Sequence, residues 1–369
     1  MSDYDLAIIG AGIGGAGLAY ALLSRAPGLK LLLLEAESQP GYHTTGRSAA
    51  FYAETYGGPG IQPLTSASRA FLAHPPADFS DSGFLGARGA LYLAPPGHPD
   101  LLDRAEAEFA NGRIPYRRVG PTEILEMAPR LRTEWATAAI YEPGCADIDV
   151  AALHQAYLRA VRRSGAMLQT DARVEALSRN ATGWNIHTPA GSFSATRLVN
   201  AAGAWGDEVA KLAGIRPVGL VPMRRTIVVA EVDPPAGPQL PLVMDAGNEL
   251  YFRVDSGRLW ISPHDETPDV PHDVQPDELD IAIALDRFEK CCDWPVKKIV
   301  SRWAGLRSFA PDRLPVLGPD PADPGFFWCV GQGGWGIQTS PAMSAVLAAL
   351  ILEEPPFLDA TLYRPARFG

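Results

Sequence analysis

The most constraining feature of the sequence is a glycine pattern close to the N-terminus. Gly10, Gly12 and Gly15 form a GxGxxG spacing directly after an apolar run, residues 6–9, and a stretch of small residues follows. This order predicts a strand, a tight turn and a helix whose N-terminal N–H groups point at a pyrophosphate. A second apolar run ends at Glu35, at the offset where a carboxylate meets a ribose hydroxyl. The segment predicts a βαβ unit that binds a dinucleotide; the alternative is a glycine-rich turn that only packs.

A second glycine pattern with the same spacing occurs near the C-terminus. Gly331, Gly333 and Gly336 follow an apolar run, residues 326–330, and precede a helix predicted over residues 340–352. Only 33 residues follow Gly336, and they contain no strand that ends in an acid. This loop is therefore predicted to fold back on the first nucleotide site instead of building its own βαβ unit.

The middle of the chain contains further pieces of the nucleotide-binding part. Asp149 is the predicted N-cap of a helix over residues 150–163, whose apolar residues recur at helical spacing. A strand near residue 198 leads into small residues before Trp205, which allow a backbone to pass close to a ligand. Two short strands are predicted at residues 166–169 and 173–176.

Two longer stretches differ in composition and predict a second, β-rich unit. They are richer in proline, β-branched and aromatic residues, with predicted strands at residues 225–229, 250–254 and 259–261. Because they interrupt the nucleotide-binding part twice, we expect a substrate cap. The fold class predicted is α/β (α+β), a Rossmann domain with an inserted β-rich substrate-binding domain. The predicted division gives residues 1–83, 141–215 and 310–369 to the nucleotide-binding domain and residues 84–140 and 216–309 to the substrate-binding domain.

Composition argues against several classes of protein. The chain has 42 Asp and Glu against 32 Lys and Arg, a formal net charge of −10, which disfavours nucleic acid as a partner. The first residues lack the basic region and the cleavable apolar stretch of a signal peptide. No apolar run reaches the roughly 18 residues that suggest a bilayer span. The four cysteines contain no CxxC, and the histidines show no HExxH spacing. We expect a reduced, cytoplasmic chain with no metal and no integral membrane segment.

Five motifs together resemble a known family. They are the first glycine turn with Glu35, residues 40–49, residues 199–205, residues 303–308 and residues 333–339. In order and spacing they are similar to the D-amino acid oxidase superfamily of FAD enzymes, and most similar to the FAD-dependent D-arginine dehydrogenases. The resemblance implies non-covalent FAD, a glutathione-reductase-like nucleotide domain and a β-rich substrate domain. With one dinucleotide unit, the chain does not resemble a flavin reductase fed by a pyridine nucleotide.

The resemblance and the local chemistry imply a set of cofactor contacts. The hydroxyls, the amides and the one arginine of residues 43–50 suit a pyrophosphate and the polar edge of a flavin, and His43 is expected to form structural hydrogen bonds there. The second glycine loop ends at a helix N-terminus, which favours negative charge on the flavin. The expected cofactor-binding residues are Gly10, Gly12, Gly14, Gly15, Glu35, Ala36, Thr44, Thr45, Gly46, Arg47, Ser48, Ala49, Val174, Gly203, Gly333, Gly334, Gly336, Ile337, Gln338 and Thr339.

The same resemblance implies a clamp for a substrate carboxylate. Hydride removal from Cα beside an apolar flavin face requires donors that hold the carboxylate, which arginine and tyrosine supply. For the arginines, a salt bridge to Asp245 or Asp312 is the alternative; for the tyrosines it is plain core packing. The expected catalytic residues are Tyr56, Arg225, Tyr251, Arg307 and Gln338, with Gly334 and Gln338 in the loop that closes over the amine.

The pocket departs from the arginine-specific pattern at two positions. A glutamate that pairs with the substrate guanidinium is Ala90 here, and a pocket histidine is Phe51, leaving Glu54 and Glu249 as candidate replacement acids. We expect oxidation of D-amino acids with neutral or apolar side chains to imino acids, which water hydrolyses to 2-oxo acid and ammonia. Oxidation of N-methyl amino acids or 2-hydroxy acids, and a non-catalytic flavoprotein, stay open as alternatives. The electron acceptor is a quinone, an electron carrier or oxygen.

Overall fold

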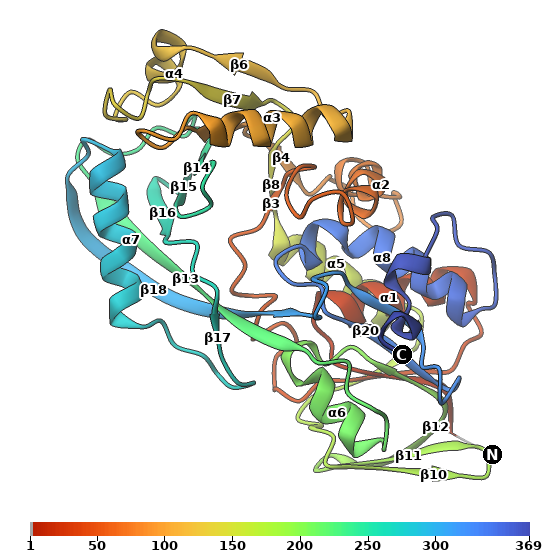
Figure 1. The fold of residues 1–369 in the computed structure, drawn as a ribbon. Coiled ribbons are helices and arrows are strands. Elements are labelled where there is room, and N and C mark those ends of the chain that lie inside the picture. Colours follow the sequence, from red (N-terminus) through yellow and green to blue (C-terminus); the bar gives the residue numbers. More distant parts are fainter. Residues whose placement is uncertain (1–2) are drawn as a thin grey trace.

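An eight-stranded sheet carries the first strand of the chain (Figure 1). In the computed structural model, which describes residues 3–369, its strands are β1 (Tyr4–Ile9), β2 (Leu31–Leu34), β9 (Met167–Gln169), β10 (Ala176–Asn180), β11 (Gly183–Thr188), β12 (Gly191–Asn200), β19 (Val316–Pro319) and β20 (Phe326–Val330). The order is β10–β11–β12–β1–β2–β9, and β20 lies between β12 and β19. β9, β2, β1, β12 and β20 pair in parallel, so their carboxyl ends meet at one edge. Ligands bind at that edge in open parallel sheets.

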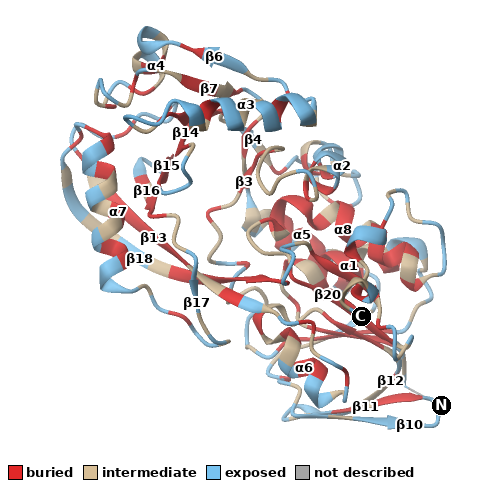
Figure 2. Ribbon diagram, in the orientation of Figure 1, coloured by how far each residue is buried: buried red, intermediate tan, exposed pale blue. Residues whose placement is uncertain are grey.

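Helices pack beside this sheet and bury its apolar strands. They are α1 (Ile13–Arg25), α2 (Gln62–Ala73), α5 (Val150–Arg163), α6 (Gly206–Leu212) and α8 (Gly336–Ile351). Figure 2 shows that α1, α5 and α8 are largely buried where they meet. Gly17 lets α1 and α8 approach closely, because an added Cβ would lie 2.7 Å from Ser344 Oγ. The chain also has three short 3-10 turns, η1 (Gly203–Trp205), η2 (Thr361–Tyr363) and η3 (Pro365–Phe368).

A second, nine-stranded sheet stands beside the first (Figure 1). It contains β5 (Ala90–Leu93), β6 (Arg117–Val119), β7 (Ala139–Glu142), β13 (Val221–Val232), β14 (Leu242–Asp245), β15 (Tyr251–Asp255), β16 (Arg258–Ser262), β17 (Thr267–Pro268) and β18 (Val296–Phe309). The order is β17–β13–β16–β15–β14–β5–β7–β6, and β18 pairs along β13. The long β13–β18 ribbon reaches from the second sheet to the first, as Figure 1 shows, and so brings side chains of one unit to the ligand edge of the other.

The remaining elements cover and connect these two sheets. Three helices lie around the second sheet: α3 (Asp100–Gly112), α4 (Pro121–Met127) and α7 (Glu278–Cys291). A small sheet, in the order β3–β8–β4, is made of β3 (Phe51–Tyr52), β4 (Leu85–Ala87) and β8 (Ala146–Ile148). β3 directly follows the loop of residues 43–50, and so fixes one end of that loop.

The mixed α/β architecture predicted from the sequence is confirmed, with two local corrections. The strand predicted at residues 173–176 is wrong, because Ala172 donates its N–H to Glu35 O and Glu175 donates to His187 O, and β10 begins only at Ala176. The C-terminal helix begins at Gly336 and not at residue 340. Pro341 is accommodated inside it, and the helix N-terminus therefore adjoins the second glycine loop directly. Over residues 3–369, no helix is long and apolar enough to cross a membrane.

Candidate cofactor and substrate site

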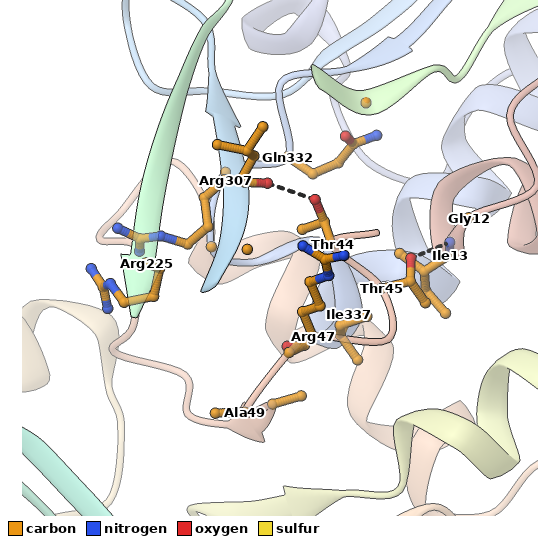
Figure 3. Close-up of a pocket in the computed structure, with 18 of the residues that line it drawn as sticks. Gly12, Ile13, Thr44, Thr45, Arg47, Ala49, Arg225, Arg307, Gln332 and Ile337 are labelled. Atoms are coloured by element: carbon orange, nitrogen blue, oxygen red, sulfur yellow. Dashed lines mark hydrogen bonds between the residues drawn. The ribbon is translucent and has the colours of Figure 1, made fainter. Parts of the chain in front are cut away.

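A long cavity follows the carboxyl edge of the parallel strands. It has two halves, which share the lining residues Gly12, Thr44, Thr45, Ala201 and Gly203. The space between atoms in the two halves is about 1110 and 930 Å³, including the part open to solvent. One half ends among Glu35, Val174 and Trp205, and the other among Arg225, Tyr251 and Arg307. Figure 3 shows the second half, with Gly12 and Thr45 on one side and the two arginines on the other.

The turn after β1 has the geometry that a pyrophosphate site needs. Gly10 has φ +103°, and an added Cβ would lie 2.4 Å from Ala201 O; at Gly15 an added Cβ would lie 1.9 Å from Gly10 O. Only glycine fits both places. Ile13, the first residue of α1, donates its N–H to Thr45 Oγ1 at 3.0 Å (Figure 3). The first turn of α1 has no acidic residue, so its dipole and remaining N–H groups favour an anion.

Glu35 lies at the end of β2, beside this turn. The carboxylate is 9% exposed and accepts the N–H of Ala11 at 3.0 Å and of Glu37 at 3.1 Å. Burial raises the pKa of Glu35, and these backbone donors oppose that shift. Two hydrogen bonds leave lone pairs on the carboxylate for the hydroxyls of a ribose.

The loop between β2 and β3 lies across the middle of the cavity. Thr44 Oγ1 donates to Leu306 O at 2.6 Å, and His43 Nε2 lies 2.9 Å from Glu37 Oε1. Arg47 lines the cavity, but its guanidinium donates to Val274 O at 2.9 Å and forms an ion pair with Asp273. The loop thus joins the two sheets through its polar side chains.

Two arginines face the far end of the cavity from the β13–β18 ribbon. Arg225 pairs with Gly305, and Arg307 pairs with Met223, so the alternation of the strands places both arginines on one face. Their side chains are 8% and 10% exposed. Burial, followed by the charge of Arg307, lowers the pKa of Arg225. Two buried like charges at a cavity favour an anionic ligand.

Protein acceptors hold each arginine in place. Arg225 Nε donates to Asp265 O at 2.9 Å and its Nη2 donates to His264 O at 3.3 Å. Arg307 Nη1 donates to Tyr56 Oη at 3.2 Å. Arg307 Nε is buried and lacks a hydrogen-bond partner among the described residues. The ring centroid of Tyr251 lies 5.8 Å from the guanidinium carbon of Arg225. The four residues predicted to hold a carboxylate therefore lie together at one end of the cavity.

The sequence interpretation missed the acid that contacts both of these arginines. Asp245 instead accepts backbone N–H groups of its own turn, and Asp312 pairs with Arg367. Glu266 Oε1 lies 2.6 Å from Arg307 Nη2 and 3.7 Å from Arg225 Nη2. Glu266 stands in a loop with no periodic pattern, so no local signal pointed to it.

The second glycine loop closes the cavity beside the clamp. An added Cβ at Gly334 would lie 2.8 Å from Tyr56 Oη and 2.9 Å from Arg307 Nη1, so a larger residue here would displace the polar ends of these two side chains. Gln338 is 2% exposed; its Oε1 accepts the N–H of Ala53 at 3.1 Å and its Nε2 donates to Tyr56 O at 3.2 Å. Gln338 lines the cavity, and its hydrogen bonds hold the segment that carries Tyr56.

An aromatic ring lines the cavity beside the two tyrosines of the clamp. The ring of Phe51 lies 5.2 Å from that of Tyr56 and 6.1 Å from that of Tyr251, measured between centroids. Ala90 belongs to the same buried cluster but is itself 0% exposed, and it pairs across β5–β7 with Glu142. The cavity therefore ends at Phe51 before it reaches Ala90.

Glu142 is a second acid that the sequence interpretation missed. Its carboxylate is 1% exposed and accepts hydrogen bonds from Tyr92 Oη at 2.9 Å and Thr55 Oγ1 at 3.1 Å. Burial raises its pKa. Of the replacement acids considered, Glu54 accepts from Ser66 at 2.6 Å, and Glu249 is 68% exposed beside Arg287.

Most of the predicted site residues line this cavity. Those that do are Gly10, Gly12, Gly14, Glu35, Ala36, Thr44, Thr45, Arg47, Ser48, Ala49, Phe51, Tyr56, Val174, Gly203, Arg225, Tyr251, Arg307, Gly333, Gly334, Gly336, Ile337 and Gln338. Four predicted residues do not line the cavity: Gly15, Gly46, Ala90 and Thr339. Of these, Gly46 donates its N–H to Gly41 O, and Thr339 Oγ1 donates to Trp335 O. Ile227, Gly305, Ser308 and Gln332 line the cavity without having been predicted as site residues. Over residues 3–369, no cluster of His, Cys, Asp and Glu could hold a metal ion.

A βαβ glycine turn, a second glycine loop and one elongated cavity define a dinucleotide-dependent oxidoreductase. The chain belongs to the FAD dependent oxidoreductase family (DAO), whose model matches residues 5–350. FAD is the cofactor of this family. The cavity fits it: Glu35 stands at the ribose end, the α1 N-terminus in the middle and the α8 N-terminus at the flavin end, and neither helix has an acid in its first turn.

Similar proteins support the family assignment both in sequence and in structure. Mitochondrial dimethylglycine dehydrogenase of Mus musculus is 31% identical over 273 residues, covering 68% of this chain but 31% of that protein. Glycine oxidase of Geobacillus kaustophilus is 26% identical over 368 residues, covering 96% of this chain and 95% of that protein. The crystal structure of that glycine oxidase has a TM-score of 0.87 at 25% sequence identity, with 100% of this chain and 99% of the other covered.

More distant structures show the fold alone. L-Proline dehydrogenase from P. horikoshii has a TM-score of 0.86 at 20% identity, with 100% of this chain and 98% of the other covered. The chain spans between 31% and 45% of the length of the dimethylglycine dehydrogenases it matches. The predicted resemblance is confirmed for the family, while the relatives named here are not D-arginine dehydrogenases.

Proposed function

We propose that the chain oxidises the Cα–N bond of a small amino acid whose carboxylate is held by Arg225 and Arg307. The observation that carries this proposal is the pair of buried guanidiniums on one face of the β13–β18 ribbon, at the end of the FAD cavity. Arginine donors match a carboxylate in shape and charge. An amine or alcohol without an acid group would bring no anionic partner to these two guanidiniums.

In this proposal the residues of the chain bind and orient the substrate. Arg225 and Arg307 hold the carboxylate, Tyr56 and Tyr251 flank it, and the Phe51 ring faces the side chain. FAD, when bound, accepts the hydride that leaves Cα. The electron pair of the deprotonated amine forms the C=N bond as the hydride leaves, and water then hydrolyses the imine to a 2-oxo acid and an amine or ammonia. No side chain of the chain is required as a base for the hydride step.

The side chain and configuration of the substrate are a finer part of the proposal. Phe51 closes the pocket, and Ala90 offers no carboxylate, so a guanidinium would enter an apolar site without a partner at a cost of several kcal/mol. We therefore infer that D-amino acids with neutral or apolar side chains are better substrates than D-Arg or D-Lys. L-isomers would present the wrong hydrogen to the flavin.

A second candidate is oxidation of glycine or an N-methyl amino acid. Relatives named dimethylglycine dehydrogenase and glycine oxidase favour it. The same carboxylate clamp serves such substrates, because they differ from D-amino acids at nitrogen and at the side chain but not at the carboxylate. We propose the cytoplasm as the compartment, because Cys145, Cys291, Cys292 and Cys329 are all free thiols, as is usual in a reducing compartment.

Anaerobic mixing of the FAD-loaded protein with a substrate panel tests both candidates. The panel contains glycine, N-methylglycine, N,N-dimethylglycine, D-Ala, D-Phe, D-Arg, L-Ala and a 2-hydroxy acid, and the readout is bleaching of flavin absorbance. Matched amines without a carboxylate are the controls. The proposal expects fast bleaching by at least one amino acid and none by the matched amine. Bleaching by the amine as fast as by the acid would contradict the role of the clamp.

A further inference from the structure

Glu266 lies against the clamp formed by Arg225 and Arg307. Its Oε1 lies 2.6 Å from Arg307 Nη2, 2.9 Å from Arg313 Nη2 and 3.7 Å from Arg225 Nη2. One carboxylate oxygen thus meets three guanidinium groups. Glu266 does not itself line the cavity, but it contacts both guanidiniums that would bind a substrate carboxylate.

We propose that Glu266 is a specificity-determining residue that restricts the clamp to substrates with a single carboxylate. The inference rests on the proposed function, in which Arg225 and Arg307 bind a substrate carboxylate. In this role Glu266 supplies negative charge to the guanidiniums, and so leaves too little positive charge for a second carboxylate of the substrate. It acts through the arginines and takes no part in hydride transfer.

The charges around the clamp support this role. Three guanidiniums, of Arg225, Arg307 and Arg313, face two carboxylates, of Asp265 and Glu266. Three positive charges minus two negative charges leave one positive charge, which a monocarboxylate neutralises and a dicarboxylate exceeds. An excess charge in a partly buried site is unfavourable, because water screens it poorly.

The two acids of the cluster differ in what they contact. Asp265 accepts the N–H of Thr226 at 2.7 Å and its Oγ1 at 3.0 Å, and its side chain is 7% exposed. Among residues 3–369, Glu266 has only arginine partners, and its side chain is 35% exposed. Asp265 therefore fixes the backbone beside Arg225, while the charge of Glu266 acts on the guanidiniums alone, from outside the cavity lining.

The variant Glu266→Gln tests the inference with two matched substrates. We compare N-methylglycine with iminodiacetate, which adds one carboxylate, by kcat/KM in the FAD-loaded protein. The expected result is a rise of roughly ten- to a hundredfold in the ratio of dicarboxylate to monocarboxylate kcat/KM. Glu266→Asp keeps the charge and should keep the wild-type ratio. Glu249→Gln, which removes an exposed glutamate paired with Arg287, is the control.

A second variant keeps the test valid if Glu266→Gln does not fold. Arg313→Gln removes one positive charge from the same cluster, and Arg313 is 46% exposed. It should lower the dicarboxylate to monocarboxylate ratio, the opposite direction from Glu266→Gln. Equal changes for both substrates in either variant would overturn the inference, because Glu266 would then only orient Arg307.

Anion binding separates failure of the inference from failure of the proposed function. Acetate and malonate are titrated into the FAD-loaded protein, with the flavin absorption spectrum as readout. Glu266→Gln should tighten malonate at least tenfold relative to acetate. If no amino acid bleaches the wild-type flavin, the proposed function fails, yet this comparison still decides the role of Glu266. An unchanged malonate to acetate ratio would overturn the role.

Discussion

Replacement of Arg225 by methionine is the sharpest test of the clamp. Methionine keeps a long side chain in a site that is 8% exposed, but it removes the charge and all five donors. The carbonyls of His264 and Asp265 lose their donor, at about 1–3 kcal/mol for each buried group left unsatisfied. The carboxylate of Asp265 keeps both of its hydrogen bonds to Thr226. We therefore expect lower stability of the folded protein, but not unfolding.

The effect on turnover follows from the loss of a charged contact in a largely buried site. Such a contact contributes about 2–5 kcal/mol, which corresponds to a fall of about 30- to 5000-fold in kcat/KM. FAD content should stay close to that of the wild type, because Arg225 lies at the substrate end of the cavity, away from Glu35 and Gly12.

The assay compares a carboxylic acid substrate with its amide. Steady-state kcat/KM is measured for both, and the ratio of flavin to protein absorbance reports FAD content. The kcat/KM for the amide should fall little in the variant, because the amide has no negative charge for Arg225 to bind. Arg258→Met is the matched control, because Arg258 is on neighbouring β16 but is 48% exposed. An unchanged kcat/KM for the acid, or an equal loss for the acid and the amide, would refute the reasoning and leave Arg307 as the main contact.

Four further predictions concern the cofactor, the turn, the pocket and the pH dependence of stability. Acid or heat precipitation should release all flavin into the supernatant; yellow precipitate would contradict non-covalent FAD. Gly15→Ala should lose most FAD, because its methyl group would lie 1.9 Å from a backbone oxygen, while Gly28→Ala, with nothing within 4 Å, should keep it. Ala90→Glu should lower Tm by several degrees, because it buries a second carboxylate opposite Glu142. Any gain in kcat/KM for D-Arg should correspond to about 1–3 kcal/mol of activation free energy. Burial lowers the pKa of His264 to about 3 in the folded protein. In the unfolded chain this histidine has its ordinary pKa of about 6.5, so below that pH the unfolded chain is protonated while the folded protein is not. The free energy of unfolding, measured by urea titration, should therefore fall by about 2 kcal/mol between pH 6.5 and 5, and His264→Gln should reduce this fall. Equal falls in the wild type and in the variant would contradict the prediction.

The nucleotide-binding unit could be predicted because its signals are local. The strand, the turn and Glu35 fall within the first 35 residues, and Gly10 and Gly15 are required by contacts with the neighbouring strand end and with the turn itself. These requirements come from short-range contacts, so the pattern can be recognised without knowing how distant segments pack. The second glycine loop was predicted for the same reason, although the helix after it begins at Gly336, four residues earlier than predicted.

The strand predicted at residues 173–176 shows where local patterns are insufficient. An apolar alternation is compatible with a strand, but Ala172 and Glu175 donate their N–H groups to Glu35 O and His187 O. These acceptors come from other parts of the sheet, so the segment crosses its edge instead of joining it there. Tertiary hydrogen bonding therefore overrode local propensity.

The site combines what the sequence determined with what only the tertiary structure decided. The sequence by itself determined the dinucleotide turn and, through resemblance, the identities of Arg225 and Arg307. The pairing of β13 with β18 decided that both arginines share one face, and the return of the chain after β16 decided that Glu266 meets them. These partners are separated by about 40 residues or more, and a charge on a loop has no periodicity that indicates its partner. Ion pairs of this kind depend on strand register and loop path, which the whole core fixes together.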